Sequence, residues 1–240
     1  MKRLLISAGM LIIWFNAISQ RTVDVDKVGS SGAGALNYVY TVGGTPFATA
    51  KFSRVVEGSP FFNEQMMKGA IILAEGKEYN DMLIRLNLLE SQINYVNEKQ
   101  VEMIASTPIK EVLLLDTIRK KEHRFIFSTF IESIEKPDKD FYELLQSGKA
   151  ALYKQYKKSL MESKPYGSAT IEQTIRTEPR YYLLVKRQWM RIKKLKELPS
   201  LIADKQKDIQ KFINDKKLSG DNEENLTAVI SFYNSLFIQE

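Results

Sequence analysis

Residues 68–116 read KGAIILAEGKEYNDMLIRLNLLESQINYVNEKQVEMIASTPIKEVLLLD, and their pattern is the strongest indication of the fold. Short apolar runs recur along it, and each is too short for a helix of ordinary length. Turn-forming residues separate the runs at Glu75-Gly76-Lys77, Leu89-Glu90-Ser91 and Asn97-Glu98-Lys99. Strands joined by tight turns form an antiparallel meander, so the stretch predicts a β-sheet.

The pattern inside the stretch predicts how the strands are buried. Between Tyr79 and Leu88 every second residue is apolar, and the alternate positions are mostly polar. That period of two is typical of an antiparallel sheet with one face in water. Val112 to Leu115 is apolar at every position, which indicates a central or covered strand.

Outward from this stretch, similar strands are predicted on both sides. Their expected ranges are Leu36–Val42, Lys51–Val56, Arg124–Ile131, Phe141–Gln146, Lys149–Tyr156, Ala169–Arg176, Arg180–Val185 and Trp189–Leu195. Ser147-Gly148 favours a hairpin after Phe141–Gln146, with a short helix at Asp140–Gln146 as the alternative. We therefore predict a mainly β fold, an antiparallel meander whose sheet is open or curved. Whether it closes into a barrel is left open.

The period changes near the C-terminus, where two helices are predicted. The first covers Leu201–Leu218, with Ser200 as its cap. Before the second, Asp221 and Glu224 resemble a capping box. The second helix carries an apolar stripe at helical spacing, formed by Leu226, Val229, Ile230, Tyr233 and Phe237. A stripe of this width predicts that residues 197–240 pack on the β domain at 36–196.

The first residues predict export. Lys2 and Arg3 precede an apolar run, and Ala17-Ile18-Ser19 is a signal-peptidase pattern, so residues 1–19 are expected to be a signal peptide cut before Gln20. Residues 20–35 include a Gly/Ser run and are expected to be a flexible lead-in. Removal of the signal leaves 33 basic against 29 acidic residues, a net charge of +4 instead of +6, too small an excess for a nucleic-acid binder.

The composition excludes several kinds of chemistry. The chain contains no cysteine, which rules out disulfides, thiolate metal sites and a cysteine nucleophile. His123 is the only histidine, so a zinc site with several histidine ligands is excluded as well. No cofactor is expected. No later stretch is apolar enough for a membrane-spanning helix, so the mature chain is expected to have none.

Two stretches resemble a family of uncharacterised secreted proteins of Bacteroidota. One runs from Gly58-Ser59-Pro60-Phe61 through Gly76-Lys77-Glu78-Tyr79 to Leu89, and the other runs from Lys216-Lys217-Leu218 to Tyr233-Asn234-Ser235-Leu236. The resemblance covers most of the mature chain and lies in turns and core positions. It implies a periplasmic or outer-membrane-associated location and carries no activity or functional residue over.

Two candidate sites follow from the residues themselves. On a strand, Arg187, Trp189, Arg191 and Lys193 would share one face, which could bind an anion or an acidic glycan of the envelope. The simpler interpretation is a solvated edge strand whose charges discourage pairing. Thr117, in Asp116-Thr117-Ile118, resembles an O-glycosylation acceptor of Bacteroidota.

The remaining titratable groups are given structural roles. His123 stands beside Lys121, Glu122 and Arg124 and is expected to be solvated rather than catalytic. The acidic pairs Asp138/Asp140 and Glu223/Glu224 are explained by solvation in a loop and by the dipole at a helix start. These assignments leave no group in an evident catalytic arrangement.

The function predicted from this is a non-enzymatic binding or scaffolding protein of the cell envelope. Its partner would be an envelope protein or an anionic envelope component, and nucleic acid is not expected. Two alternatives are a hydrolase of envelope glycans or peptides that uses carboxylates, and a carrier of a lipid or small apolar ligand. A cleft with facing carboxylates favours the hydrolase, an apolar cavity the carrier, and an exposed binding face the scaffold.

Overall fold

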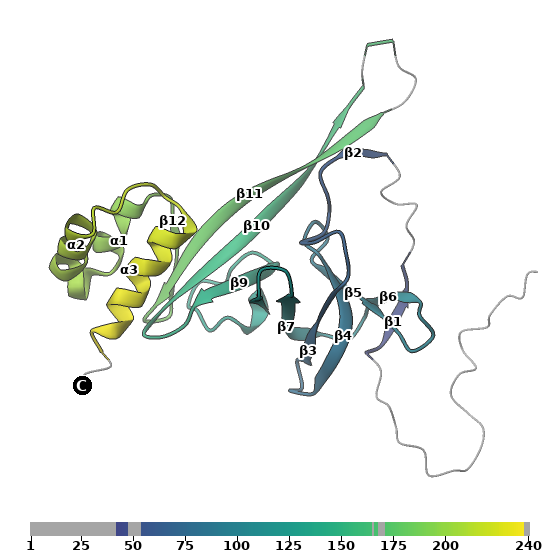
Figure 1. Ribbon diagram of the computed structural model, residues 1–240, viewed down its shortest axis with the longest axis horizontal. Helices are drawn as coiled ribbons and strands as arrows, with labels where there is room; N and C mark the ends of the chain where they lie inside the picture. The colour runs from purple at the N-terminus through teal and green to yellow at the C-terminus, as the bar shows by residue number, and fades with distance from the viewer. Residues whose placement is uncertain (1–41, 48–53, 165, 168–170, 238–240) are drawn as a thin grey trace, which may run out of the picture. The chain divides into compact units, whose positions relative to one another are not determined.

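The computed structural model describes residues 42–47, 54–164, 166–167 and 171–237 (Figure 1). The predicted signal peptide, the lead-in and all of the expected strand Leu36–Val42 except Val42 lie outside the described residues. So does the first part of the expected strand Lys51–Val56.

The fold is mainly β, as predicted. The strands are β1 (Gly44–Pro46), β2 (Val55–Glu57), β3 (Met67–Leu73), β4 (Glu78–Asn87), β5 (Gln92–Val96), β6 (Glu102–Ala105), β7 (Ile109–Asp116), β8 (Lys121–Phe127), β9 (Phe141–Gln146), β10 (Ala150–Ser163), β11 (Glu172–Val185) and β12 (Gln188–Ile192). Within the described residues they form one open sheet in the order β1-β6-β5-β4-β3-β7-β8-β9-β10-β11-β12. Every pair along this path is antiparallel, while β2 pairs with β11 in parallel.

The meander packs as its period of two predicts. Ile84 and Leu86 on β4 are almost fully buried, whereas Leu83 between them is exposed. β7 lies between β3 and β8, which confirms the central position predicted for Val112–Leu115. These strands enclose the first apolar core, which includes Ile71, Ile84, Val112, Leu114 and Phe125.

β9 and β10 form the predicted hairpin, so the alternative helix at Asp140–Gln146 is wrong. The turn is held from outside by Asn234 of the last helix. The Asn234 amide accepts from the backbone N–H of Ala150 at 2.8 Å and donates to the carbonyl oxygens of Ala150 at 2.9 Å and Ser147 at 3.2 Å. One side chain thus replaces the strand partners that these backbone groups lack at the turn.

We expect Gly148→Val to lower the melting temperature clearly. Gly148 has φ +146°, and a Cβ there would lie 2.5 Å from the Asn234 amide nitrogen. The strained backbone alone costs on the order of 1 kcal/mol, and the clash would also displace Asn234. Thermal unfolding by circular dichroism measures the effect, with exposed Lys149→Val as the comparison, which is expected to stay within about 0.5 kcal/mol of the unmutated protein. Equal, small effects would mean that the turn does not depend on Gly148.

The C-terminal part contains two helices of ordinary length, α2 (Gln206–Asp215) and α3 (Glu223–Ser235). The single helix predicted at Leu201–Leu218 is wrong, because the chain first forms the one-turn helix α1 (Leu198–Leu201) and the 3₁₀ turn η5 (Ala203–Lys205). Pro199 explains the earlier start, since proline favours the first turn of a helix. Ser200 therefore lies inside α1 and caps nothing.

The cap predicted for the last helix is also one residue off. Asn222 is the N-cap of α3, and its side chain accepts from the backbone N–H of Asn225 at 2.9 Å. The Asp221 carboxylate instead accepts from the backbone N–H of Leu195 at 2.7 Å. It joins the loop before α3 to the 3₁₀ turn η4 (Leu195–Glu197) that follows β12.

The helices pack on the ends of β10, β11 and β12 (Figure 1). On α3, Leu226, Val229, Ile230 and Tyr233 of the predicted stripe are buried. They share a second core with residues of the sheet and the other helices, among them Ala150, Leu152, Leu183, Val185, Ile202 and Ile209. The chain thus closes a second apolar core over one end of its own sheet.

Candidate functional site

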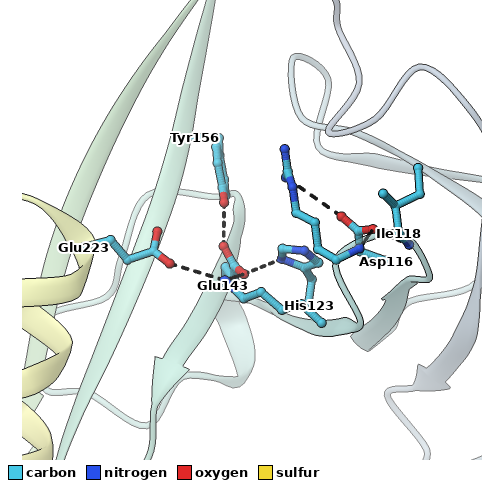
Figure 2. Close-up of polar contacts among 8 residues, drawn as sticks. Asp116, Ile118, His123, Glu143, Tyr156 and Glu223 are labelled. Atoms are coloured by element: carbon cyan, nitrogen blue, oxygen red, sulfur yellow. Dashed lines mark hydrogen bonds and ion pairs between the residues drawn. The ribbon is translucent and has the colours of Figure 1, made fainter.

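A buried polar cluster joins three neighbouring strands (Figure 2). His123 on β8, Glu143 on β9 and Tyr156 on β10 meet through the two carboxylate oxygens of Glu143. The His123 Nδ1 lies 2.6 Å from Glu143 Oε1, and the Tyr156 hydroxyl donates to Glu143 Oε2, also at 2.6 Å. Only 5% of His123 and 1% of Glu143 are exposed, so the solvated position predicted for His123 is wrong.

The error has a physical reason. β8 begins at Lys121, three residues before the strand that the sequence predicts, and His123 therefore shares a face with Phe125. Phe62 packs edge-on against this face, with its ring centre 4.9 Å from that of His123 and 5.3 Å from that of Tyr156. The imidazole is thus part of the first core rather than of a charged surface.

Glu143 is charged although it is buried. Burial by itself raises the pKa of a carboxyl, but the hydrogen bonds from His123 and Tyr156 and the nearby charges outweigh it and hold the pKa of Glu143 below its usual value. Burial and the Glu143 carboxylate raise the pKa of Tyr156. At neutral pH the phenol is therefore a donor to a carboxylate, which makes this a charge-assisted hydrogen bond.

Two lysines connect the cluster to helix α3. Lys121 Nζ lies 3.8 Å from Glu143 Oε1 and 3.3 Å from Glu223 Oε1 (Figure 2). Lys154 Nζ lies 2.7 Å from the other Glu223 oxygen and 4.4 Å from the centre of the Tyr156 ring. Glu223 lies in the first turn of α3, as predicted, and it also binds the helix start to β8 and β10.

This cluster is built for stability rather than for catalysis. A histidine oriented by a carboxylate is half of a nucleophile-activating arrangement. Here both groups are buried and closed in by Phe62 and Tyr156, so a substrate has no access to the imidazole. Among the described residues no group of three or more His, Cys, Asp or Glu side chains could hold a metal ion.

The second buried carboxylate, Asp140, is also fully engaged. It accepts from Ser91 Oγ at 3.0 Å, the backbone N–H of Phe141 at 2.8 Å and Gln155 Nε2 at 2.8 Å. Burial raises the pKa of Asp140, although each of these hydrogen bonds by itself lowers it. Solvation, the explanation given for the Asp138/Asp140 pair, holds for exposed Asp138 and is wrong for Asp140. Its bond to Ser91 connects the β4–β5 turn to the residue before β9.

Of the four residues predicted to bind an anion, Trp189 and Arg191 lie on β12, Arg187 precedes this strand and Lys193 follows it. Arg187 lies in the turn before β12 at φ +66°, and its carbonyl accepts from Ile134 N–H. Trp189 packs among Tyr142, Tyr153 and Tyr182, with its ring stacked on that of Tyr182 at 5.0 Å. Arg191 is paired with Glu178 at 3.2 Å, and Lys193 is exposed beyond β12. Anion binding by this set stays a prediction.

Thr117 lies in the turn between β7 and β8 and is exposed. Asp116 shapes this turn, because its carboxylate accepts from the backbone N–H groups of Ile118 at 3.0 Å and Arg119 at 2.9 Å. The hydrogen bond from Arg119 is the main reason that the pKa of Asp116 is lowered. Glycosylation of Thr117 stays a prediction, at a position that a glycosyltransferase could reach.

The feature that the sequence did not reveal is a long β-arm, which we define as residues 157–163 of β10 with 172–178 of β11. The two strands pair without interruption from Ala150 and Val185 to Ser163 and Glu172. The predicted break between Arg176 and Arg180 is therefore wrong. Pro179 is accommodated because it lies between the part of β11 that pairs with β2 and the part that pairs with β12.

The β-arm extends past β9, while β2 pairs with its other strand at Gln173 and Thr174 (Figure 1). β9 pairs with β10 only at Leu152–Lys154, so beyond that point β11 is the only described partner of β10. The base of the β-arm is anchored by Lys158, whose Nζ donates to the Ser59 carbonyl at 2.8 Å. Four apolar residues at and near its end are at least 41% exposed: Leu160, Met161, Tyr166 and Ile171. Leu160 and Met161 are consecutive in β10 and therefore lie on opposite faces of the β-arm, so each face carries an exposed apolar side chain.

No helix in the described part of the chain is long and apolar enough to cross a membrane. No protein-family model matches this chain, and no curated protein or solved structure is significantly similar to it.

Proposed function

We propose that this chain is an exported, non-enzymatic binding or scaffolding protein of the cell envelope, and that it holds a partner protein through the β-arm. The observation that carries the proposal is the outer edge of β10 in the β-arm, which has no strand partner among the described residues and lies beside exposed Leu160 and Met161. Leu160 and Met161 are each more than 40% exposed on β10, which continues past its last pairing with β9, and Ile171 just before β11 is 41% exposed. Burial of these side chains by a partner would be favourable by roughly 25 cal/mol for each Å² of apolar surface.

The backbone of the β-arm favours a protein partner over a lipid or a glycan. Beyond Lys154, the outer edge of β10 has no strand partner among the described residues. An exposed strand edge offers unpaired N–H and C=O groups that bind an added strand. Apolar side chains beside such an edge supply pockets for the side chains of that strand. The partner class is therefore an envelope protein with an extended segment.

The polar groups of the chain support the same conclusion. The hydrolase alternative needs two carboxyls that face each other across a cleft. Glu143 and Asp140 are instead buried and occupied by their donors. The surface that is left available is the β-arm, where the outer edge of β10 is unpaired among the described residues and Leu160 and Met161 are exposed.

The β-arm predicts which substitutions abolish partner binding. We expect Leu160→Ser with Met161→Ser to abolish cross-linking of the full chain to its partner in intact cells, with little change in melting temperature, because both residues are exposed. Ile118→Ser is the matched control, since Ile118 is 91% exposed in the β7–β8 turn. The measurement is the cross-linked species on a denaturing gel after treatment of whole cells. Unchanged cross-linking in the double variant would place the partner elsewhere.

Export has its own test. We expect the protein recovered from the envelope fraction to begin at Gln20, because Ala17-Ile18-Ser19 precedes it as a signal-peptidase pattern. Intact-mass spectrometry measures this directly. A mass that includes residues 1–19, or recovery in the cytoplasmic fraction alone, would overturn the envelope assignment while leaving the β-arm as a binding element.

A further inference from the structure

A hollow of about 330 Å³ opens where β5, β6 and β7 face the segment from β8 to β9. That volume lies at the lower end of the range of small-molecule sites, about 300–1,000 Å³. Its walls are mostly apolar and come from five strands and the 3₁₀ turn η3 (Ser128–Phe130); they include Ile93, Ala105, Ile109, Phe127, Phe130 and Phe141. Phe127 and Phe130 are half-buried, so part of their ring surface faces the hollow.

Two lysines lie at the hollow and its neighbour. Lys139 lines it, and a second hollow of about 260 Å³ adjoins it, sharing Thr129 and Lys139 and adding Lys136. Neither lining contains a carboxylate. Within the described residues neither lysine has an ion pair, and both are exposed. Asp138, next to Lys139 in the sequence, is exposed, and buried Asp140 is occupied by its three donors.

We propose that these hollows bind a small amphiphilic carboxylate, a molecule like a medium-chain fatty acid. Its chain lies against Phe127, Phe130 and Ile109, and its carboxylate faces Lys139. An apolar wall with a few well-placed polar groups is the usual composition of a small-molecule site. A lysine at the mouth gives the bound molecule one orientation, because the ammonium attracts the carboxylate and the hydrocarbon chain packs against the apolar wall. This site is separate from the β-arm and does not depend on the function proposed for it.

The probe is decanoate, titrated calorimetrically into the full mature chain, with decanol as the uncharged comparison. We expect one decanoate to bind per chain, about tenfold or more tighter than decanol, because a charge-assisted contact is lost with the alcohol. Lys139→Glu should weaken decanoate by at least about tenfold and leave decanol unchanged. Lys196→Glu makes the same change of charge at an exposed position outside both hollows and should alter neither affinity.

A second variant tests where decanoate binds rather than the role of the Lys139 charge. Thr129 lines both hollows and is exposed, so Thr129→Trp should fill them without unfolding the chain and should weaken decanoate and decanol together. The melting temperature of each variant confirms that it is folded. Leu160→Ser with Met161→Ser should bind decanoate as the unmutated protein does. The proposal is overturned by an absence of saturable decanoate binding, by full affinity in Lys139→Glu, or by full affinity in folded Thr129→Trp.

Discussion

A chain that ends at Leu195 is expected to lose its cooperative unfolding transition. Without α1, α2 and α3 the second core is open, and the apolar faces of Ala150, Leu152, Leu183 and Val185 are exposed to water. Single substitutions should show the same dependence on a smaller scale. Ile230 and Tyr233 are completely buried, so Ile230→Ala and Tyr233→Ala should each cost about 2–5 kcal/mol.

The measurement is urea unfolding followed by circular dichroism. Ser231→Ala is the matched control, because Ser231 lies between these two residues on α3 and is exposed. This substitution should change stability by less than about 0.5 kcal/mol. Tyr233 has a further contact, since its hydroxyl donates to Asp204 Oδ2 at 3.2 Å. Tyr233→Phe separates that bond from the packing of the ring. A soluble, cooperatively folded chain ending at Leu195 would show that the helices are an appendage and not part of the core.

Removal of the Glu143 carboxylate is the other change with a large expected effect. Glu143→Ala leaves His123, Tyr156 and Lys121 without their common partner in a buried site. Breaking a buried, charged network by removing one partner typically costs about 3–5 kcal/mol. Glu122→Ala, on the exposed face of β8, is the control and should have little effect. Equal stability of the two variants would mean that the cluster contributes nothing to folding.

The pH dependence of stability follows from the same cluster. The pKa of Glu143 is lower in the folded state than its ordinary value of 4.5, so its contribution is present above pH 4.5 and is lost as the pH falls through the lower folded value. The pKa of Tyr156 is raised from 10.0, so stability is also lost as the pH rises above that value. The urea concentration at the midpoint of unfolding of the unmutated protein should therefore fall below pH 4.5 and above pH 10.0. In Glu143→Gln the loss below pH 4.5 should be smaller.

The sheet and the last helix were predictable because their signals are local. The alternation in Tyr79–Leu88 and the stripe from Leu226 to Tyr233 depend only on which face each residue occupies, and both are buried as predicted. Element boundaries were less predictable. A helix starting at Leu201 after a Ser200 cap was expected, and the earlier start at Leu198 with a break at Ile202 reflects Pro199 and packing in the second core.

The polar cluster and the β-arm were not predictable, because they depend on which strands lie side by side. Nothing in the sequence around His123 shows that Glu143 on β9 pairs with Phe125, two residues from His123, or that Phe62 packs against the imidazole. The aromatic Trp189 was assigned to an open cationic face for the same reason, although three tyrosines enclose it. A period of two likewise identifies β10 as a strand without showing that its last residues lack a second neighbour.

The most direct test of the β-arm as the partner-binding element is a photo-cross-linker placed in the full chain in living cells. Benzoylphenylalanine at Tyr166, fully exposed at the end of the hairpin, should give one discrete protein adduct that disappears in the Leu160→Ser, Met161→Ser background. The same group at Ile134, which is 69% exposed away from the β-arm, should give none. An adduct at Ile134 and none at Tyr166 would contradict partner binding through the β-arm.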